Sequence, residues 1–394
     1  MTSGEIKALD AANVMQTYAR FDAAIDHGCG STLYSPEGKE FIDFTSGIGV
    51  NSLGYGNTAW ADAVYAQAKK LQHISNLYYS EPYARLASKL IERTGMADVF
   101  FANSGAESNE GAIKLARKYS FDKYGKGRSD IVTLRQSFHG RTVTTLAATG
   151  QDVFHNYFFP FTEGFSFAAA NDIESVKNAC TAATCAVMFE LIQGEGGVLP
   201  LDMEFVRQVA EFCAEKDMLL IVDEVQTGVG RTGTLFAFQQ YGVKPDVVTF
   251  AKGIAGGLPF GGFMASEKCR SVLNAGTHAT TFGGNPVCAA AAYEVLSQID
   301  DGLLAGVTEK GRYITETVMS WGLPCVAGVR GLGLMLGIAL KGIAPKDIAQ
   351  KCVENGLLIL TAGSDALRLL PPLVITYEEI DKGLAILKSV LSQV

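Results

Sequence analysis

The chain has 394 residues, of which 48% are hydrophobic and 19% are charged, and its formal net charge is −8. This composition excludes a disordered or collagen-like chain, and the length predicts two or three domains, or one large α/β domain with an appendage. Because the acidic excess is not interrupted by blocks of Lys or Arg, we expect no binding to nucleic acid or to an anionic membrane surface.

The N-terminal 45 residues are predicted to form a hairpin. A turn at 34–38, with the sequence Tyr-Ser-Pro-Glu-Gly, precedes the largely apolar run Glu-Phe-Ile-Asp-Phe at 40–44. We expect this hairpin to pack with the C-terminal part of the chain rather than with the large sheet predicted for the middle.

The middle of the chain, from about residue 98 to 264, alternates short apolar runs with amphipathic stretches such as 204–216. The apolar runs are continuous, as is typical of strands that are covered on both faces. They occupy 98–102, 131–134, 185–190, 219–223 and 247–250. Strand, helix and strand in this order predict a mainly parallel sheet wrapped by helices, which is the α/β class.

The C-terminal part has a different pattern. Residues after about 297 predict a helix at 302–321, a strand pair at 325–340, a helix at 345–355, two short strands and a final helix at 377–394. This mixture indicates a small α+β domain. We therefore divide the chain into an N-terminal segment (1–45) that packs with the small domain, a large domain (46–297) and a C-terminal small domain (298–394).

Cysteine and histidine usage argues against disulfides and metal sites. The eight cysteines are scattered without a CxxC pair, and the five histidines show no metal-binding spacing. We therefore expect reduced thiols and no bound metal. No apolar run approaches the roughly 18 residues that span a bilayer, and Glu5 and Lys7 interrupt any signal-peptide pattern. These features predict a soluble, cytoplasmic protein.

Three features at the ends of predicted strands could carry chemistry, because open α/β sheets place ligands there. The segment Asn103-Ser-Gly-Ala-Glu-Ser-Asn109 opens a helix whose free N–H groups suit a phosphate. Asp223 ends one apolar strand, and Lys252 lies between another strand and several glycines. A buried carboxylate requires a cation or a donor, and burial lowers the pKa of a lysine so that its neutral amine can attack a carbonyl. Taken singly, each has a plainer explanation: a capped helix, a salt bridge and an exposed lysine.

A fourth feature is the segment 137–142, Ser-Phe-His-Gly-Arg-Thr. Phe138 can cover a flat ring and Arg141 can bind a carboxylate through two hydrogen bonds, whereas His139 is expected to act as a hydrogen-bonded supporting residue. The run 228–233 matches the GxGxxG dinucleotide fingerprint, but it does not follow its strand directly, and the next acidic residue, Asp246, begins a strand. We therefore reject NAD binding.

One cofactor fits these features together. Pyridoxal phosphate requires a lysine that bonds to its aldehyde, an acidic partner for its pyridinium nitrogen and a site for its phosphate. Lys252, Asp223 and the helix start near Gly105 offer these three groups, and Phe138 offers an aromatic cover.

Over nearly its whole length the chain resembles the class III, fold type I, pyridoxal-phosphate-dependent aminotransferases. The matching motifs are Asn103-Ser-Gly-Ala-Glu107, Phe138-His-Gly-Arg-Thr142, Gln193-Gly-Glu-Gly-Gly197, Asp223-Glu-Val-Gln-Thr-Gly228, Gly230-Arg-Thr-Gly233, Ala251-Lys-Gly253, Thr280-Thr-Phe-Gly-Gly-Asn-Pro286 and Leu367-Arg-Leu-Leu-Pro-Pro-Leu373. The resemblance implies a large domain with a mainly parallel central sheet and a small α+β domain built from both termini.

The resemblance also implies roles for the residues around the cofactor. Lys252 would bond to pyridoxal phosphate and later move a proton, and Asp223 would keep the pyridinium nitrogen protonated. The other implied cofactor-binding residues are Gly105 and Ala106 at the phosphate, Phe138 and Val225 on the ring faces, Gln226 at the O3′ side, and Thr281 at the phosphate of the neighbouring subunit. The role of Thr281 implies a homodimer with shared active sites.

Substrate binding is implied in the same way. Arg368 would hold the α-carboxylate of glutamate, and Arg141 its distal carboxylate or the α-carboxylate of acetylornithine. Glu195 would pair with Arg368 when an ω-amino donor is bound, and Thr280 would lie beside the substrate. The implied reaction transfers the δ-amino group of N2-acetylornithine to 2-oxoglutarate, and it runs in reverse during arginine biosynthesis.

Other functions use the same machinery. Succinylornithine, 4-aminobutyrate and N-acetyllysine are alternative amino donors, glutamate-1-semialdehyde aminomutase is an alternative reaction, and a non-catalytic binding module is a third possibility. Lys252 and Asp223 argue against the binding module, and Arg368 together with Glu195 argues against the mutase.

The chain departs from its relatives at a few positions. Ornithine aminotransferases have a tyrosine near the position of the 47–51 turn. This chain has Gly47 and Gly49 there, which leave room for an acylated amine and so favour acetylornithine. Leu191 stands in place of a common proline, Ala279 in place of a frequent glycine, and the segment 53–57 lacks the usual His-Pro. None of these differences removes a catalytic group.

Overall fold

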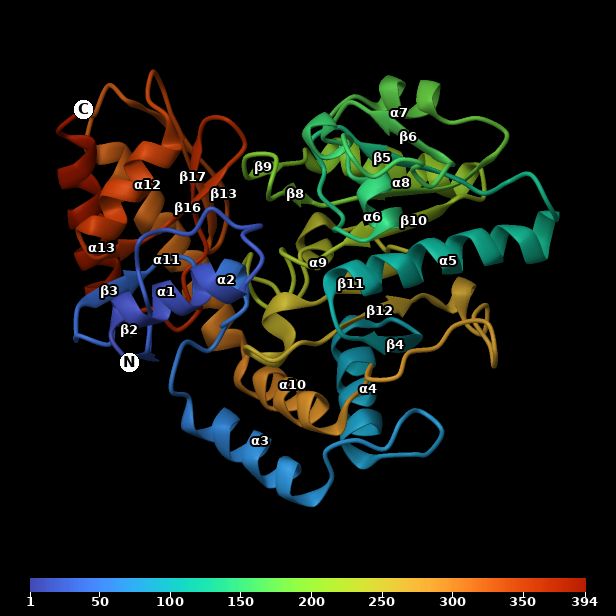
Figure 1. Cartoon of the computed structure of the whole chain (residues 1–394). Helices are drawn as coiled ribbons and strands as arrows, with labels where there is room; N and C mark the ends of the chain where they lie inside the picture. Colours follow the sequence, from blue (N-terminus) through green and yellow to red (C-terminus); the bar gives the residue numbers. More distant parts are fainter.

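The computed structural model describes all 394 residues, and the chain folds into two lobes with both termini in the same lobe (Figure 1). The helices are α1 (Ser3–Asn13), α2 (Ser46–Gly49), α3 (Thr58–Lys70), α4 (Glu81–Thr94), α5 (Gly105–Tyr124), α6 (Val143–Ala148), α7 (Ile173–Ala179), α8 (Met203–Glu215), α9 (Phe238–Tyr241), α10 (Pro286–Gln298), α11 (Asp301–Ser320), α12 (Pro345–Glu354) and α13 (Tyr377–Leu391). Three short 3-10 helices are η1 (Asp152–Phe154), η2 (Lys252–Ala255) and η3 (Glu267–Cys269).

A seven-stranded sheet with the order β4-β12-β11-β10-β7-β5-β6 forms the centre of the larger lobe. Its strands are β4 (Asp98–Ala102), β5 (Asp130–Leu134), β6 (Phe165–Ala168), β7 (Thr184–Phe189), β10 (Leu219–Asp223), β11 (Val247–Phe250) and β12 (Gly261–Ala265). Only β12 runs antiparallel to its neighbours, β11 and β4. The predicted α/β class with a mainly parallel central sheet is therefore confirmed, with β6 and β12 as strands that the apolar runs did not predict.

Helices cover both faces of this sheet because successive strand residues point to opposite sides. In β10, Leu219 and Ile221 join the apolar core that contains residues of α5, whereas Leu220 and Val222 join the core that contains residues of α8. All five residues of β10 are buried. Strands that are covered on both faces consist of continuous apolar runs, which explains why the sequence pattern predicted these strands correctly.

The second lobe combines residues from the two ends of the chain. An antiparallel sheet with the order β13-β14-β17-β16 contains β13 (Val326–Leu332), β14 (Met335–Leu340), β16 (Leu360–Ala362) and β17 (Ala366–Leu369). A second sheet joins β1 (His27–Cys29), β2 (Thr32–Tyr34) and β3 (Glu40–Asp43) to β15 (Leu357–Leu358), and β15 runs parallel to β3. The strands of the N-terminal segment thus hydrogen-bond to a C-terminal strand. The domain boundaries at 45 and 297 remain a proposal.

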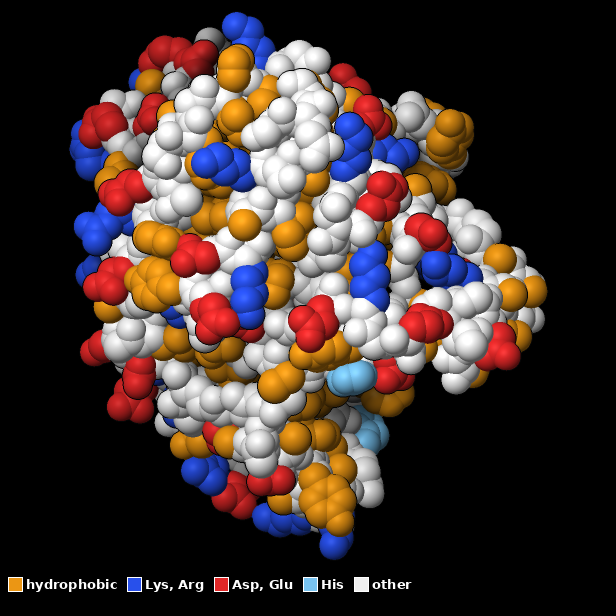
Figure 2. All heavy atoms as spheres, turned by 90° about the vertical axis from the view of Figure 1, so that its left-hand side faces the viewer, with side chains coloured by type: hydrophobic (Ala, Val, Ile, Leu, Met, Phe, Trp, Pro, Cys, Tyr) orange, Lys and Arg blue, Asp and Glu red, His pale blue; other side chains and the backbone are white.

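The face that carries α12 and α13 shows basic and acidic side chains interspersed (Figure 2). The C-terminal helices also contain ion pairs within a helix, Arg312–Glu316 in α11 and Lys382–Glu378 in α13. No helix is both long enough and apolar enough to cross a membrane.

Candidate active site

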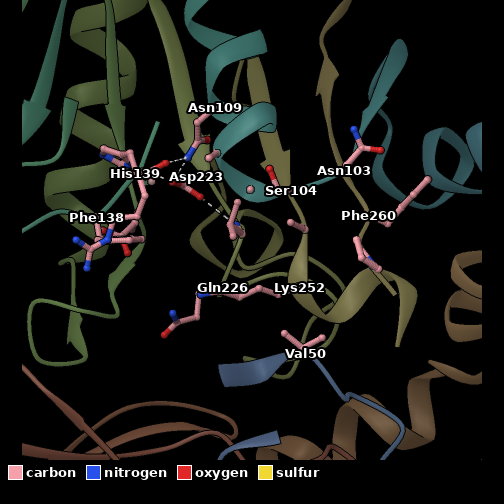
Figure 3. Close-up of a pocket in the computed structure, with 18 of the residues that line it drawn as sticks. Val50, Asn103, Ser104, Asn109, Phe138, His139, Asp223, Gln226, Lys252 and Phe260 are labelled. Atoms are coloured by element: carbon pink, nitrogen blue, oxygen red, sulfur yellow. Dashed lines mark hydrogen bonds and ion pairs between the residues drawn. The ribbon is translucent and has the colours of Figure 1, made fainter. Parts of the chain in front are cut away.

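The segments that follow β4, β5, β10 and β11 surround a cavity of about 580 Å³ at the carboxyl ends of these strands. This is the edge at which parallel α/β sheets place ligands. Eight of the residues predicted from the sequence line the cavity: Gly105, Ala106, Phe138, Arg141, Asp223, Val225, Gln226 and Lys252. Figure 3 shows four of them, Phe138, Asp223, Gln226 and Lys252, around this space.

Lys252 follows β11 directly and is the first residue of η2. Its φ of 45° is unusual for a residue with a side chain, and the turn that this angle creates places the amine at the cavity. Burial lowers the pKa of Lys252 to about 8, although Glu195 acts in the opposite direction. A substantial fraction of the amine is therefore neutral near physiological pH and able to act as a nucleophile.

Asp223 is the last residue of β10 and only 3% exposed. Its Oδ2 accepts hydrogen bonds from Asn109 Nδ2 and His139 Nδ1, both at 2.8 Å, and its Oδ1 accepts one from the Val225 backbone N–H at 3.0 Å. No Lys or Arg forms a salt bridge with Asp223, so the alternative interpretation of this carboxylate, an ordinary salt bridge to a basic residue, does not hold. A buried carboxylate with neutral donors and one histidine fits a protonated ring nitrogen as a further partner.

The start of α5 offers free backbone N–H groups to an anion. Ser104 caps this helix, and its Oγ accepts a hydrogen bond from the Glu107 N–H at 3.2 Å. Gly105 is the first residue of the helix, and a Cβ at this position would lie 2.7 Å from Val225 Cγ1. Only glycine lets the helix start lie this close to Val225, and the positive end of the helix dipole then faces the cavity. The helix extends to Tyr124.

The two arginines of the site differ in their surroundings. Arg368, on β17, is 3% exposed, and its Nη1 lies 2.6 Å from Glu195 Oε1 and 3.2 Å from Gln226 Oε1. Burial alone would raise the pKa of Glu195, but the charge of Arg368 outweighs it and lowers that pKa. Arg141 is exposed, and its guanidinium lies over the rings of Phe154 and Phe138. One guanidinium is thus neutralised by the protein, and the other is available to an anion.

The two predicted threonines lie beside the cavity rather than in its wall. Thr280 Oγ1 accepts a hydrogen bond from Asn103 Nδ2 at 3.3 Å, and Asn103 itself lines the cavity. Thr281 is exposed and does not contribute to the wall that this chain forms. The structure therefore brings Thr280 near the other predicted residues and leaves Thr281 facing outward.

Several residues that line the cavity were not predicted from the sequence, and Asn109, Glu190 and Tyr18 are examples. Asn109 donates a hydrogen bond to Asp223. It is a polar residue on the buried face of α5, and a polar residue at an apolar position of a helix pattern could have marked it as a candidate. Glu190 accepts a hydrogen bond from the Phe138 N–H at 2.9 Å, and burial raises its pKa to about 7. Tyr18 lines the cavity while remaining 74% exposed, and it comes from an irregular segment without any periodic signal.

The remaining sequence features, the 47–51 turn, Leu191 and the GxGxxG run, have these positions in the structure. Residues 46–49 all have positive φ angles, and Val50 after them lines the cavity. Leu191 is fully buried, and its carbonyl accepts a hydrogen bond from the Tyr241 hydroxyl. The GxGxxG run at 228–233 lies in turns, and its Arg231 is buried and donates to the carbonyls of Leu334 and Pro371. No group of three His, Cys, Asp or Glu side chains could hold a metal ion.

The cavity has the donor set that pyridoxal phosphate requires. It contains a lysine amine of lowered pKa, a buried carboxylate without a Lys or Arg partner, and a helix start at which a glycine is sterically necessary. Near the carboxylate, Asn109 Oδ1 and His139 Nε2 are buried without hydrogen-bond partners. When bound, pyridoxal phosphate acts as an electron sink that stabilises negative charge on the carbon bearing the amine.

Comparisons with known proteins agree with this geometry. Residues 14–391 match the family model described as aminotransferase class-III. The chain is 51% identical to a Haemophilus ducreyi protein named acetylornithine aminotransferase, over 100% of both chains, and 44% identical to a Yersinia pestis protein named succinylornithine transaminase, over 97% of this chain and 95% of the relative.

Solved structures give the same result. The ornithine aminotransferase of Toxoplasma gondii superimposes with a TM-score of 0.95 at 30% identity, covering 100% of this chain and 96% of that one. The N-acetylornithine aminotransferase of Stenotrophomonas maltophilia superimposes with a TM-score of 0.85 at 35% identity, covering 98% of both. The fold is therefore that of the fold type I enzymes, as predicted. The chain belongs to the class-III aminotransferases and is a pyridoxal-phosphate-dependent transaminase that acts on small amino and keto acids.

Proposed function

We propose that the protein transfers the δ-amino group of N2-acetylornithine to 2-oxoglutarate, which gives N-acetylglutamate semialdehyde and glutamate. The reverse direction would serve arginine biosynthesis. The observation that carries this proposal is the contrast between the two arginines: Arg368 is paired with Glu195 at 2.6 Å, whereas Arg141 is exposed and lies over aromatic rings. A donor such as acetylornithine presents one carboxylate and needs one free guanidinium, and glutamate presents two.

In this proposal Lys252 would hold the cofactor through its Nζ. With a donor bound, the same Nζ would take the proton from the amine-bearing carbon of the donor and pass it on, and the cofactor would supply the electron sink for the charge left on that carbon. Asp223 would keep the ring nitrogen protonated, Phe138 and Val225 would cover the ring faces, and the N–H groups of Gly105 and Ala106 would bind the phosphate. Gln226 would bind at the O3′ side of the ring, and Thr280 would lie beside the substrate.

We further propose a homodimer in which Thr281 reaches the phosphate site of the second subunit. Four large apolar or aromatic side chains lie exposed in the segments 77–79 and 280–283: Leu77 (86%), Tyr78 (67%), Tyr79 (106%) and Phe282 (61%). The segments are adjacent because Asn76 Nδ2 donates to the carbonyls of Thr280 and Gly283. A second copy of the chain would bury this surface. The cytoplasmic location stays a prediction from the cysteine usage.

The assay is glutamate formation from acetylornithine and 2-oxoglutarate with the purified protein and its cofactor. Glutamate should appear, and omission of 2-oxoglutarate should stop turnover after one half-reaction. Product with 4-aminobutyrate or N-acetyllysine but not with acetylornithine would contradict the choice of donor, and continued turnover without a keto acid would indicate the mutase.

Succinylornithine is the second candidate donor, because relatives named succinylornithine transaminase are 44% identical to the chain. The two donors differ only in the acyl group, so kcat/KM measured for both with the same enzyme preparation decides between them. Free ornithine in the same series tests whether the acyl group is required.

A further inference from the structure

Arg141 is placed by aromatic rings instead of by an acidic partner. Its guanidinium carbon lies 4.1 Å from the centroid of the Phe154 ring and 5.6 Å from that of Phe138. The two rings meet edge to face, at 5.9 Å and an interplanar angle of 74°. Phe154 is therefore the closer ring, and it was not among the residues that the sequence patterns single out.

Phe154 reaches this position because its loop is tied down on both sides. Gln151 Nε2 donates to the carbonyl of Ser137, next to Phe138, at 3.0 Å, and His155 Nε2 lies 2.9 Å from the carbonyl of Leu146 on α6. Between these anchors Phe154 is the last residue of η1 and half-buried. The following aromatic residues point outward, for example Phe158, which is 60% exposed.

The type of contact determines what Arg141 can still do. A carboxylate partner would occupy the N–H groups of the guanidinium, as Glu195 does at Arg368. An aromatic face attracts the cation through its quadrupole and leaves the N–H edge free for hydrogen bonds. An arginine side chain otherwise has about 2 kcal/mol of rotamer entropy to lose on ordering. A ring contact therefore orients the guanidinium before the substrate arrives without competing for its donors.

We propose that Phe154 is a positioning residue that holds the Arg141 guanidinium ready for a substrate carboxylate, and that it thereby sets the preference for carboxylate-bearing donors. This inference rests on the proposed function, in which Arg141 binds the α-carboxylate of acetylornithine and the distal carboxylate of glutamate. Phe154 makes the closer contact to Arg141 and Phe138 the more distant one, so the closer ring can be replaced while the ring assigned to the cofactor is kept.

The test is a double-mutant cycle on the holoenzyme with Phe154→Leu, Arg141→Ala and the double variant, followed in each half-reaction. Cation–π contacts of about 0.5–2 kcal/mol correspond to a loss of roughly 2- to 30-fold. We expect Phe154→Leu to lower kcat/KM by about 10-fold through KM, with kcat nearly unchanged. In the Arg141→Ala background it should cost less than about 2-fold. Phe154→Tyr, which keeps the ring, should restore most of the loss.

Phe158→Leu is the matched control, because it removes an exposed ring of the same loop that does not contact Arg141. Its kcat/KM should equal that of the wild type. An equal loss from Phe154→Leu in both backgrounds, or a loss in kcat alone, would overturn the proposal, since the ring would then act on the fold rather than on Arg141. If the wild type converts its cofactor with glutamate but not with acetylornithine, the proposed function fails while the cycle measured with glutamate still decides the role of Phe154.

Discussion

Replacing Glu195 by glutamine tests whether the ion pair with Arg368 sets the balance between an ω-amine donor and glutamate. Glu195 Oε1 lies 2.6 Å from Arg368 Nη1, and Gln226 is the only other side chain that accepts from this guanidinium. Because Arg368 is 3% exposed, Glu195→Gln leaves a buried positive charge with neutral partners. Acetylornithine has no carboxylate to offer at this end, whereas glutamate brings one.

The expected magnitude follows from the burial of the pair. Removing one partner of a buried ion pair costs about 3–5 kcal/mol. Glutamine keeps a hydrogen bond of about 1 kcal/mol, and the Glu195 side chain is 30% exposed, which weakens the interaction. Arg368 is unpaired in the free variant as well as in its transition state with acetylornithine, so this cost of about 1.5–3 kcal/mol cancels for that donor, and kcat/KM with acetylornithine should change by less than about 3-fold. The glutamate half-reaction should gain about 1.5–3 kcal/mol, which is about 10- to 160-fold in kcat/KM, because the α-carboxylate of glutamate then pairs with Arg368 without displacing Glu195.

Each half-reaction can be followed separately through the absorbance of the cofactor, with a single substrate and no turnover. Asp365→Asn is the matched control, because Asp365 forms an ion pair of 2.7 Å with Arg330 outside the cavity. This control should leave the ratio of the two half-reactions unchanged. An equal change in both half-reactions of Glu195→Gln, or no gain with glutamate, would refute the reasoning.

Three further predictions concern the cofactor-binding residues. Lys252→Met should abolish turnover and should stabilise the cofactor-free protein at pH 7 by about 2–3 kcal/mol, because it removes a buried positive charge. Burial lowers the lysine pKa to about 8. Between about pH 8 and 10.5 the folded state therefore binds fewer protons than the unfolded state. Wild-type stability therefore rises with pH in that window, and urea unfolding at pH 7 and 9.5 should show the difference between the two proteins shrinking. Asp223→Asn should lower kcat by about 10²- to 10³-fold with the same fold by circular dichroism, since it removes a buried charge while keeping its size; an unchanged kcat would exclude a role for the charge. Gly105→Ala should weaken cofactor binding by about 5- to 100-fold, because its Cβ would lie 2.7 Å from Val225 Cγ1, and Gly105→Ala combined with Val225→Ala should recover affinity in a fluorescence titration.

Much of the fold could be predicted because buried strands and amphipathic helices leave periodic patterns. The runs at 219–223 and 247–250 are β10 and β11 with the predicted bounds. Strand β12 was missed because it begins with two glycines, which interrupt the pattern but are required by the sheet: a Cβ on Gly262 would lie 2.4 Å from the Phe100 carbonyl oxygen. Helix α1 was missed because none of its residues is buried, so it has no apolar stripe.

The candidate site could be predicted as far as it consists of strand ends. Asp223 and Lys252 follow apolar runs, and adjacent parallel strands bring their ends together. Contacts between remote segments leave no local pattern. The hydrogen bond from Asn109 to Asp223 spans 114 positions, and the cavity wall formed by Tyr18 comes from a segment without regular structure. Whether a charged residue is paired or free is equally invisible in the sequence, because it depends on such remote contacts.

The charged residues of the cavity differ in whether they have a partner of opposite charge, and this difference explains how one cavity can serve both halves of a transamination. Arg368 has its charge neutralised by Glu195, so it can accept a carboxylate only by exchange of one anion for another. Arg141 is held by rings that leave its donors free, so it can accept a carboxylate directly. Asp223 has no Lys or Arg partner, and a protonated ring nitrogen can supply that positive charge. A two-carboxylate substrate therefore displaces Glu195, a one-carboxylate donor leaves it in place, and in both cases the number of buried opposite charges remains matched, which is the condition under which buried ions are tolerated.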